Sequence, residues 1–203
     1  MATKKLNGTV IVTYRCNARC TMCNRYKAPS KPEEEISLET IRKLPPMYFT
    51  NITGGEPLLR PDLPQIVEAV REGFEDAGVE PDLALTTNGI GLDRVIDSLV
   101  DAGLQRLNVS IDSLDPVRFA ELSRRKRSSD VLRGLDAVDA SALPGTVKLN
   151  TVVVDEASLE EIPQPRSLLP WSVAISGVPL SSCRLALWRP LFLRARRRRI
   201  FSE

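Results

Sequence analysis

The chain has 203 residues, a length that suits one domain with its own core and leaves little room for a second. The composition, 42% hydrophobic and 27% charged, is ordinary for a soluble globular protein. No stretch has the roughly 18 apolar residues that a membrane span needs, and histidine is absent, which excludes Ser-His and Cys-His nucleophiles. Without a secretory signal pattern at the N-terminus, we expect a cytoplasmic protein.

The net charge of +2 hides an asymmetry between the two ends of the chain. Residues 184–203 hold seven of the 28 basic residues and one of the 26 acidic ones, so the rest carries a net −4. Such a basic end is typical either of a solvated or divergent tail or of a phosphate or RNA contact. Few aromatic residues accompany the arginines, so we do not expect nucleic acid as a partner.

Runs of β-branched and aliphatic residues alternate with longer amphipathic stretches, which is typical of βα units and a parallel sheet. Because Val, Ile, Leu and Thr dominate these runs, the pattern predicts five strands. They cover residues 9–13, 49–53, 83–87, 106–110 and 147–153. A sixth strand is expected over residues 171–175, in a region that prolines otherwise interrupt.

The helices are predicted from apolar spacing and from the residues at their ends. Ser37 is a suitable N-cap, and Asp115-Pro116 begins a helix with proline at its first position. Apolar residues three and four apart predict a helix from residue 63 that Gly73 and Gly78 bring to an end. The same spacing predicts two further helices, over residues 92–100, ended by Gly103, and over residues 131–138.

Unusual residues follow four of the predicted strands directly: cysteines, then Gly-Gly-Glu-Pro, then Thr-Asn-Gly, then Ser-Ile-Asp. Right-handed crossovers bring the carboxyl ends of parallel strands to one edge, so we expect one site there, in a doubly wound sheet or a barrel. The core domain is expected to span residues 1–162. Residues 163–203 are expected to form an irregular segment rich in proline and arginine, divergent or truncated.

Cys16, Cys20 and Cys23 form a C-x3-C-x2-C array directly after the first strand. Three neighbouring cysteines do not suit a disulfide framework, so the array favours a metal or cluster. A [4Fe-4S] cluster usually takes four thiolates, and three leave one iron open to another ligand. The alternatives are cysteines that only pack, or a zinc knuckle, whose fourth ligand would have to be the remote Cys183.

The motif Gly54-Gly55-Glu56-Pro57 follows the second strand, where two glycines allow a backbone to approach a ligand closely. A plain strand-to-helix turn is the alternative explanation. Together with the cysteine array and the strand order, the motif makes residues 8–155 resemble the radical S-adenosylmethionine (SAM) superfamily. The resemblance implies an α/β fold, a partial TIM-type (βα) barrel of five to six parallel strands.

The resemblance also implies cofactors and chemistry. A [4Fe-4S] cluster on Cys16, Cys20 and Cys23 would bind SAM through its open iron, with Gly54, Gly55 and Glu56 near the methionyl group. Reductive cleavage of a C–S bond then gives a 5'-deoxyadenosyl radical that abstracts hydrogen from a substrate. No catalytic residue is expected beyond the cluster, and the electron donor is expected to be a reduced flavodoxin- or ferredoxin-type protein.

Polar residues at the later strand ends are expected to complete the SAM site. Thr87 and Ser110 offer hydroxyl groups there, although the Asn-Gly after Thr87 is also typical of a simple turn. Lys148 and Asn150 alternate along the fifth strand and so share one face. A lysine buried without an anion is costly, so the carboxylate of SAM is the expected partner of Lys148.

Within the superfamily, residues 83–154 resemble the GTP 3',8-cyclases of molybdenum cofactor biosynthesis, whereas the N-terminal part resembles other radical SAM enzymes. Four residues match cosubstrate contacts of the cyclases: Gly55, Thr87, Ser110 and Lys148. The cyclases have basic residues near the first two strands, where this chain has Thr9, Phe49 and Asn51. They also have a second three-cysteine cluster, where only Cys183 remains here. We therefore expect a radical SAM enzyme acting on another small molecule or on a peptide, with a GTP cyclase and a non-catalytic truncated fragment as alternatives.

Overall fold

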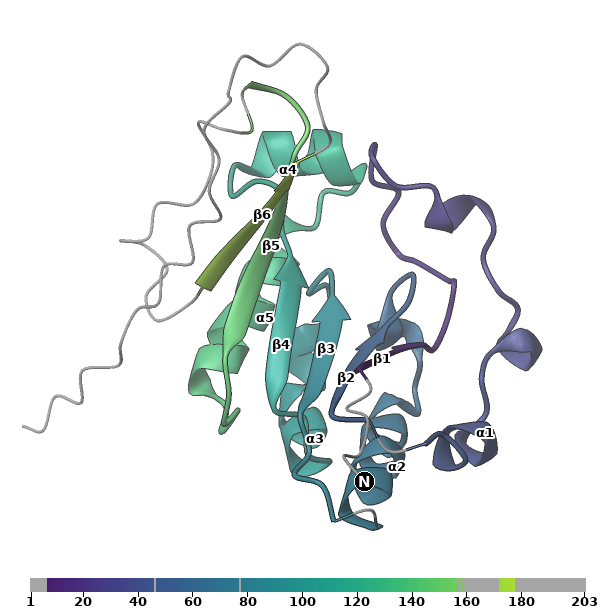
Figure 1. The fold of residues 1–203 in the computed structure, drawn as a ribbon. Coiled ribbons are helices and arrows are strands. Elements are labelled where there is room, and N and C mark those ends of the chain that lie inside the picture. Colours follow the sequence, from purple (N-terminus) through teal and green to yellow (C-terminus); the bar gives the residue numbers. More distant parts are fainter. Residues whose placement is uncertain (1–6, 46, 77, 157, 159–171, 178–203) are drawn as a thin grey trace, which may run out of the picture.

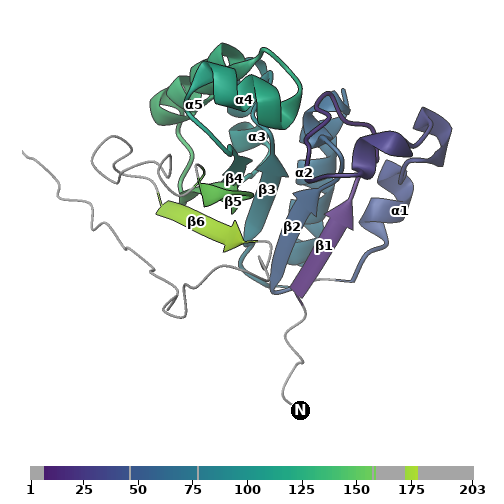
Figure 2. The same cartoon turned by 90° about the horizontal axis from the view of Figure 1, so that it is seen from above.

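The computed structural model describes residues 7–45, 47–76, 78–156, 158 and 172–177, and these form one six-stranded sheet. All strands are parallel and neighbours in space follow the order of the chain. The strands are β1 (Asn7–Ile11), β2 (Phe49–Thr53), β3 (Leu83–Thr87), β4 (Arg106–Ser110), β5 (Val147–Val153) and β6 (Ser172–Gly177). Seen from above in Figure 2, the strands stand in a curved row and turn progressively from β1 to β6. This arrangement is the incomplete (βα) barrel that the sequence predicts.

Five α-helices connect the strands: α1 (Leu38–Arg42), α2 (Leu63–Asp76), α3 (Ile96–Asp101), α4 (Pro116–Ser123) and α5 (Ser128–Ala140). Four single 3-10 turns accompany them: η1 (Arg25–Lys27), η2 (Pro32–Glu34), η3 (Pro57–Leu59) and η4 (Leu92–Arg94). The helices lie on one face of the sheet, as Figures 1 and 2 show, and the described elements leave the other face open. One-sided cover follows from right-handed crossovers that all turn the same way.

The hydrophobic core lies between this sheet and its helices. Leu85, Leu107 and Leu149 come from three neighbouring strands and have no exposed surface. They pack in one cluster with residues such as Ile66 of α2 and Val131 of α5. Each of these leucines precedes a polar residue, Thr86, Asn108 or Asn150, so the opposite face of the sheet is largely polar.

The predicted strands agree closely with the structure. The second to fifth have the predicted bounds, and the sixth is one residue later at its start and two at its end. The prediction for the first strand is wrong by two residues at both ends, because β1 covers Asn7–Ile11 rather than residues 9–13. From Thr13 onward the backbone bonds to the glycine turn after β2 instead of to β2 itself.

The predicted helix caps are confirmed, but Gly73 does not end the helix that begins at residue 63. The hydroxyl of Ser37 accepts a hydrogen bond from the amide of Thr40 at 3.2 Å, and Asp115 caps α4 in the same way. Helix α2 continues through Gly73 to Asp76 and stops before Gly78, which has a left-handed φ of 64°. One interior glycine costs only about 1 kcal/mol, which burial of the next side chain, Phe74, offsets.

The helix predicted over residues 92–100 is divided in the structure. The turn η4 ends at Arg94, and α3 begins only at Ile96. Val95 between them has φ −130°, outside the helical region, so one apolar stripe is shared between two short elements. Gly103, with φ 105°, follows α3 as predicted.

The predicted division at residue 162 lies outside the described residues, as does Cys183. Strand β6 nevertheless belongs to the predicted C-terminal segment and pairs with β5 along its whole length. The sheet therefore extends into that segment. Among the residues that the structure describes, no helix is both long and apolar enough to cross a membrane.

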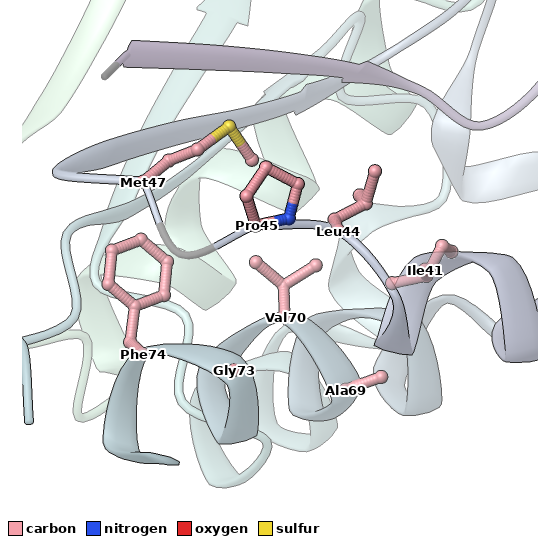
Figure 3. A pocket seen from close by; sticks show the side chains of 8 residues that line it. All are labelled: Ile41, Leu44, Pro45, Met47, Ala69, Val70, Gly73 and Phe74. Atoms are coloured by element: carbon pink, nitrogen blue, oxygen red, sulfur yellow. The ribbon is translucent and has the colours of Figure 1, made fainter. Parts of the chain in front are cut away.

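A small apolar cavity lies between α1, α2 and the turn before β2 (Figure 3). Its volume of about 10 Å³ is close to the space that one water molecule needs. The lining residues are Ile41, Leu44, Pro45, Met47, Ala69, Val70, Gly73 and Phe74. None of them is polar in its side chain, so the cavity is a packing defect of the core and not a ligand site.

Candidate functional site

The cysteine loop begins where β1 ends, and its root is bonded to the segment after β2. The amide of Gly55 donates to the carbonyl of Thr13 at 2.7 Å, and the amide of Glu56 donates to the carbonyl of Arg15 at 2.8 Å. Arg15 is the residue immediately before Cys16. The Gly-Gly-Glu motif therefore holds the backbone from which the first cysteine projects.

The two glycines are required by this close approach. A Cβ atom on Gly54 would lie 2.4 Å from the carbonyl oxygen of Thr13, and one on Gly55 would lie 2.3 Å from that of Arg15. Neither glycine has a positive φ, so their small size matters and not their backbone freedom. From the sequence, we expected these glycines to allow close approach to a ligand. In the structure they allow close approach to the backbone of residues 13–15. Their contact with SAM stays a prediction.

Glu56 is completely buried, and its carboxyl group joins the ends of β2 and β3. It accepts hydrogen bonds from the hydroxyl of Thr87 at 2.7 Å, the amide of Asn88 at 2.7 Å and the amide of Leu58 at 3.0 Å. Burial raises the pKa of Glu56 to about 7, although the three donors favour the ionised form. The Thr87 hydroxyl also accepts from the amide of Gly89 at 3.0 Å. Inside the protein, the two predicted SAM contacts Glu56 and Thr87 thus bind each other.

The three cysteines are free thiols at the surface of the loop. Cys16 and Cys20 are partly buried and Cys23 is exposed. Burial raises the pKa of Cys16 and raises that of Cys20 to about 11, and the neighbouring thiols act in the same direction, which places the three close together. Within the described ranges, no three His, Cys, Asp or Glu side chains are arranged to hold a metal ion.

Backbone amides already point at two of the sulfur atoms. The amide of Ala18 lies 3.4 Å from Cys16 Sγ, and the amide of Arg25 lies 3.5 Å from Cys23 Sγ. Such donors stabilise negative charge on a thiolate, the form that binds iron. The donor set, three thiols of which two have amides turned toward them, therefore fits an iron–sulfur cluster better than a hard cation such as Mg²⁺.

The far side of the cysteine loop is clamped by the junction between α4 and α5, beside which it passes in Figure 1. Four hydrogen bonds form this clamp: Arg19 N to Ser123 O (3.0 Å), Thr21 N to Leu122 O (2.8 Å), Arg125 Nε to Asn17 O (2.7 Å) and Arg124 Nη1 to Tyr26 Oη (3.3 Å). Arg124 has φ 54°, the one positive φ outside glycine in the described residues. The junction thus turns sharply where it meets the loop.

A buried ionic network holds the root of the same loop. Glu35, with a side chain only 3% exposed, accepts two hydrogen bonds from Arg15, at 2.7 and 3.0 Å, and also accepts from Thr13 and Ser30. Arg60 reaches the same carboxylate at 3.4 Å. These donors keep the pKa of Glu35 below its usual value against the opposing effect of burial.

The open face of the sheet carries a polar row. The hydroxyl of Thr86 donates to Asn51 Oδ1 at 3.0 Å, and Asn108 Nδ2 donates to the Thr86 hydroxyl at 3.2 Å. Lys148 is in register with Asn108 on the next strand, and it is partly exposed, not buried as the sequence argument assumed. Lys148 therefore needs no anion to compensate for burial, and its contact with the carboxylate of SAM stays a prediction.

The predicted SAM residues fall into two groups in the structure. Gly54, Gly55, Glu56 and Thr87 meet at the root of the cysteine loop. Ser110, Lys148 and Asn150 lie on β4 and β5, where Ser110 is exposed and in register with Asn150. The structure describes no hydrogen bond between the two groups.

Three residues near the cysteines were not predicted: Glu35, Arg60 and Asp112. Asp112 follows β4, accepts from the amide of Val152 at 3.0 Å, and its charge contributes to the raised pKa of Cys20. Its position in the Ser-Ile-Asp sequence after a strand was a usable signal. Glu35 ends a run of three glutamates, and nothing local distinguishes it from the two before it.

Comparison with protein families gives one matching model, described as the Radical SAM superfamily, over residues 10–164. Among similar curated proteins, the GTP 3',8-cyclase of Streptomyces coelicolor is 42% identical over 176 residues, covering 81% of this chain and 48% of the relative. The GTP 3',8-cyclase of Chlorobaculum tepidum is 39% identical over 159 residues, covering 76% and 47%. The chain thus spans about half the length of these relatives.

Solved structures share the fold at low sequence identity. Methylornithine synthase superposes with a TM-score of 0.63 at 14% identity, over 85% of this chain and 53% of the other. SuiB of Streptococcus suis, solved with S-adenosylmethionine bound, gives a TM-score of 0.58 at 17% identity, over 86% and 40%. At such identities the likeness is one of fold.

Proposed function

This chain belongs to the radical SAM superfamily, and on that premise we propose that Cys16, Cys20 and Cys23 bind a [4Fe-4S] cluster and that the protein cleaves SAM reductively. Members of the family use such a cluster together with SAM. When bound, the pair supplies an electron to a C–S bond and a carbon radical that removes a hydrogen atom from a substrate. The observation that carries the proposal is the three-cysteine loop fastened at the carboxyl edge of the sheet.

The chain's own residues would keep this site in place. The Gly54-Gly55 turn and Glu56 hold the backbone before Cys16, and the α4–α5 junction holds the backbone after it. A loop fixed at both sides loses little conformational entropy when its sulfur atoms bind a cluster. We assign Ser110, Lys148 and Asn150 to SAM or substrate, because Lys148 and Asn150 share the open face of β5 and Ser110 is in register with Asn150.

We propose a small molecule or a peptide as substrate. The open face in β2 to β4 is lined by amide and hydroxyl groups, Asn51, Thr86 and Asn108, whose side chains already bond to one another. Such a row suits a neutral polar ligand that exchanges hydrogen bonds, and is a poor match for a polyanion. Cysteines that bind a cluster must stay reduced, so we propose a cytoplasmic location.

A second candidate function is GTP 3',8-cyclase activity, part of molybdenum cofactor biosynthesis. Its support is the identity of 35–42% to eight curated proteins of that name. The match covers about half of those proteins, and Thr9 and Asn51 stand where the resemblance implies basic residues. A non-catalytic truncated form is the remaining alternative.

Anaerobic reconstitution with iron and sulfide tests the cluster. We expect about four iron and four sulfide per chain and a broad visible absorption, both lost in Cys20→Ala. Cys183→Ala is the matched control, because it removes a cysteine outside the array and should keep the cluster. A cluster that survives in Cys20→Ala contradicts the proposal.

The second experiment tests the activity of the reconstituted protein. After reduction with dithionite in the presence of SAM, we expect 5'-deoxyadenosine, measured by chromatography and mass spectrometry. Its absence despite a full cluster favours the non-catalytic form. Formation that rises on addition of GTP, with a new purine product, would instead establish the cyclase activity.

A further inference from the structure

Two segments of this protein that lie far apart in the sequence are basic and contain no acidic residue. Residues 16–32 include Arg19, Arg25, Lys27 and Lys31, and residues 122–129 include four consecutive basic residues, 124–127. The four hydrogen bonds of the α4–α5 clamp bring these segments together. They therefore form one positively charged surface around the outer side of the cysteine loop.

The charges that face solvent define what we call the basic rim. It consists of five exposed residues: Arg19, Arg25, Lys27, Arg124 and Lys126. Lys31 is also exposed but is left out, because Glu33 and Glu34 lie beside it. In the part of the chain that the structure describes, none of the five forms an ion pair, whereas Arg127 is paired with Asp130. Arg25 lies over the ring of Tyr14 at 5.4 Å, and Arg124 donates to the hydroxyl of Tyr26, so both side chains are held in place without losing their charge.

The rim residues flank the exposed cysteine in the sequence, and the rim differs in charge from the inner side of the loop. Cys23, the most exposed of the three, lies between Arg19 and Arg25 in the sequence. On the inner side, the carboxyl groups of Asp112 and Glu56 are close enough to act on Cys20 and Cys16. Because Arg125 also acts on Cys16 and Arg15 lies at the loop root, the inner side carries charges of both signs, whereas the rim carries only positive charge.

We infer that the basic rim is the docking surface for an acidic electron-transfer protein of flavodoxin or ferredoxin type, which reduces the site at its Cys23 edge. The inference rests on the proposed function, since only a bound cluster accepts the electron. In the step, the donor loses one electron and the cluster gains it, going from the 2+ to the 1+ state, and no atom is transferred. A ring of unpaired charge around the electron's entry point steers an oppositely charged partner into productive contact.

A phosphate-bearing ligand is the other class that such a surface attracts. The geometry favours the protein donor, because the five side chains are exposed and spread over two surface segments. A triphosphate is bound through converging donors in an enclosed site. The open polar face of the sheet, and not the rim, offers the hydrogen-bonding row that a small ligand needs.

Direct binding is the first test. Oxidised acidic flavodoxin is titrated into the reconstituted protein, and the Kd is measured by calorimetry at low and high salt. We expect Lys27→Glu/Lys126→Glu to weaken binding about tenfold or more, and high salt to weaken the unaltered protein in the same way. Lys43→Glu, the same substitution at the exposed C-cap of α1, is the control for one such charge reversal and should leave the Kd unchanged.

Turnover with two reductants separates this inference from the proposed function. With reduced flavodoxin, the double variant should form 5'-deoxyadenosine more slowly by a similar factor; with dithionite, its rate should equal that of the unaltered protein. The inference is wrong if the double variant and the unaltered protein bind flavodoxin with equal Kd values. It is also wrong if the double variant loses binding of inorganic triphosphate but still binds flavodoxin. If the unaltered protein forms no product with dithionite, the proposed function fails, and the titration still decides whether the rim docks the donor.

Discussion

The two halves of the candidate site are built differently. Around the ends of β1, β2 and β3, buried groups such as Glu35 and Glu56 have three or more partners each, and the cysteine loop is bonded on both sides. On β4 and β5, Ser110, Lys148 and Asn150 are exposed or partly exposed. The first half is preorganised to hold a cofactor, whereas the second leaves its polar groups available to a ligand.

The largest expected difference between the halves concerns Glu35. Glu35→Ala leaves Arg60, which is only 8% exposed, with fewer partners, and it releases Arg15 before the first cysteine. We expect the free energy of unfolding to fall by about 4 kcal/mol, as measured by urea denaturation. Glu39→Ala, which breaks an exposed pair with Lys43, should cost less than about 0.5 kcal/mol. If the two variants lose similar amounts of stability, the ionic network of Glu35 does not stabilise the protein more than an exposed ion pair does.

Gly55→Ala tests the close approach at the loop root. Its Cβ would lie 2.3 Å from a backbone oxygen that other bonds hold in place, so two backbones must separate. We expect a loss of about 3 kcal/mol in stability and a lower iron content after reconstitution. A variant with full stability and full iron content would show that the approach is not needed.

Glu56 should make stability depend on pH. Its pKa in the folded protein, about 7, lies above the ordinary 4.5, so the folded state holds the proton more tightly. The stabilisation is complete below about pH 4.5 and is lost as the pH rises through 7, by about 3 kcal/mol. Glu35 and Asp62 have lowered pKa values, so their contribution is lost only in more acidic solution. Glu56→Gln should remove the change between pH 5 and 8 in thermal or urea unfolding, whereas Glu68→Gln on the surface of α2 should not.

Gly73→Ala is expected to stabilise the protein, in contrast to Gly55→Ala. Gly73 is inside α2 and partly exposed, and a Cβ there meets nothing within 4 Å. Removing an interior helical glycine should raise the free energy of unfolding by about 1 kcal/mol. If Gly73→Ala lowers the stability instead, position 73 does not tolerate an added methyl group. The different outcomes at Gly55 and Gly73 would then not be explained by the space available to a Cβ atom.

The smallest effect on folding is expected in the open half. Lys148→Met should change the free energy of unfolding by less than about 0.5 kcal/mol, because Lys148 is partly exposed and the methionine keeps its apolar stem. Binding of SAM to the reconstituted protein, measured by equilibrium dialysis, should weaken. A loss above about 2 kcal/mol in stability would make β5 part of the preorganised half.

Local features of the sequence were sufficient for most of the framework. The aliphatic runs predicted the exact bounds of four strands, and Ser37 and Asp115 cap helices as predicted. Strand patterns and helix caps can be predicted because each depends on residues only a few positions apart. The spacing of Cys16, Cys20 and Cys23 and the Gly-Gly-Glu-Pro motif were enough to identify the family, which the comparisons confirmed. Two helix predictions were wrong because packing decided the outcome. The helix expected over residues 92–100 is divided at Val95, and α2 continues through Gly73.

Only the tertiary structure decided which residues work together. Glu35 bonds to Arg60 across 25 positions of the sequence, Glu56 bonds to Thr87 across 31, and Arg125 bonds to Asn17 across 108. No periodicity links positions so far apart, because the contacts arise only when parallel strands bring their ends to one edge. The sequence by itself determined which chemistry the cysteine loop can support; the fold determined that glycines, buried carboxylates and a distant basic segment hold and surround it.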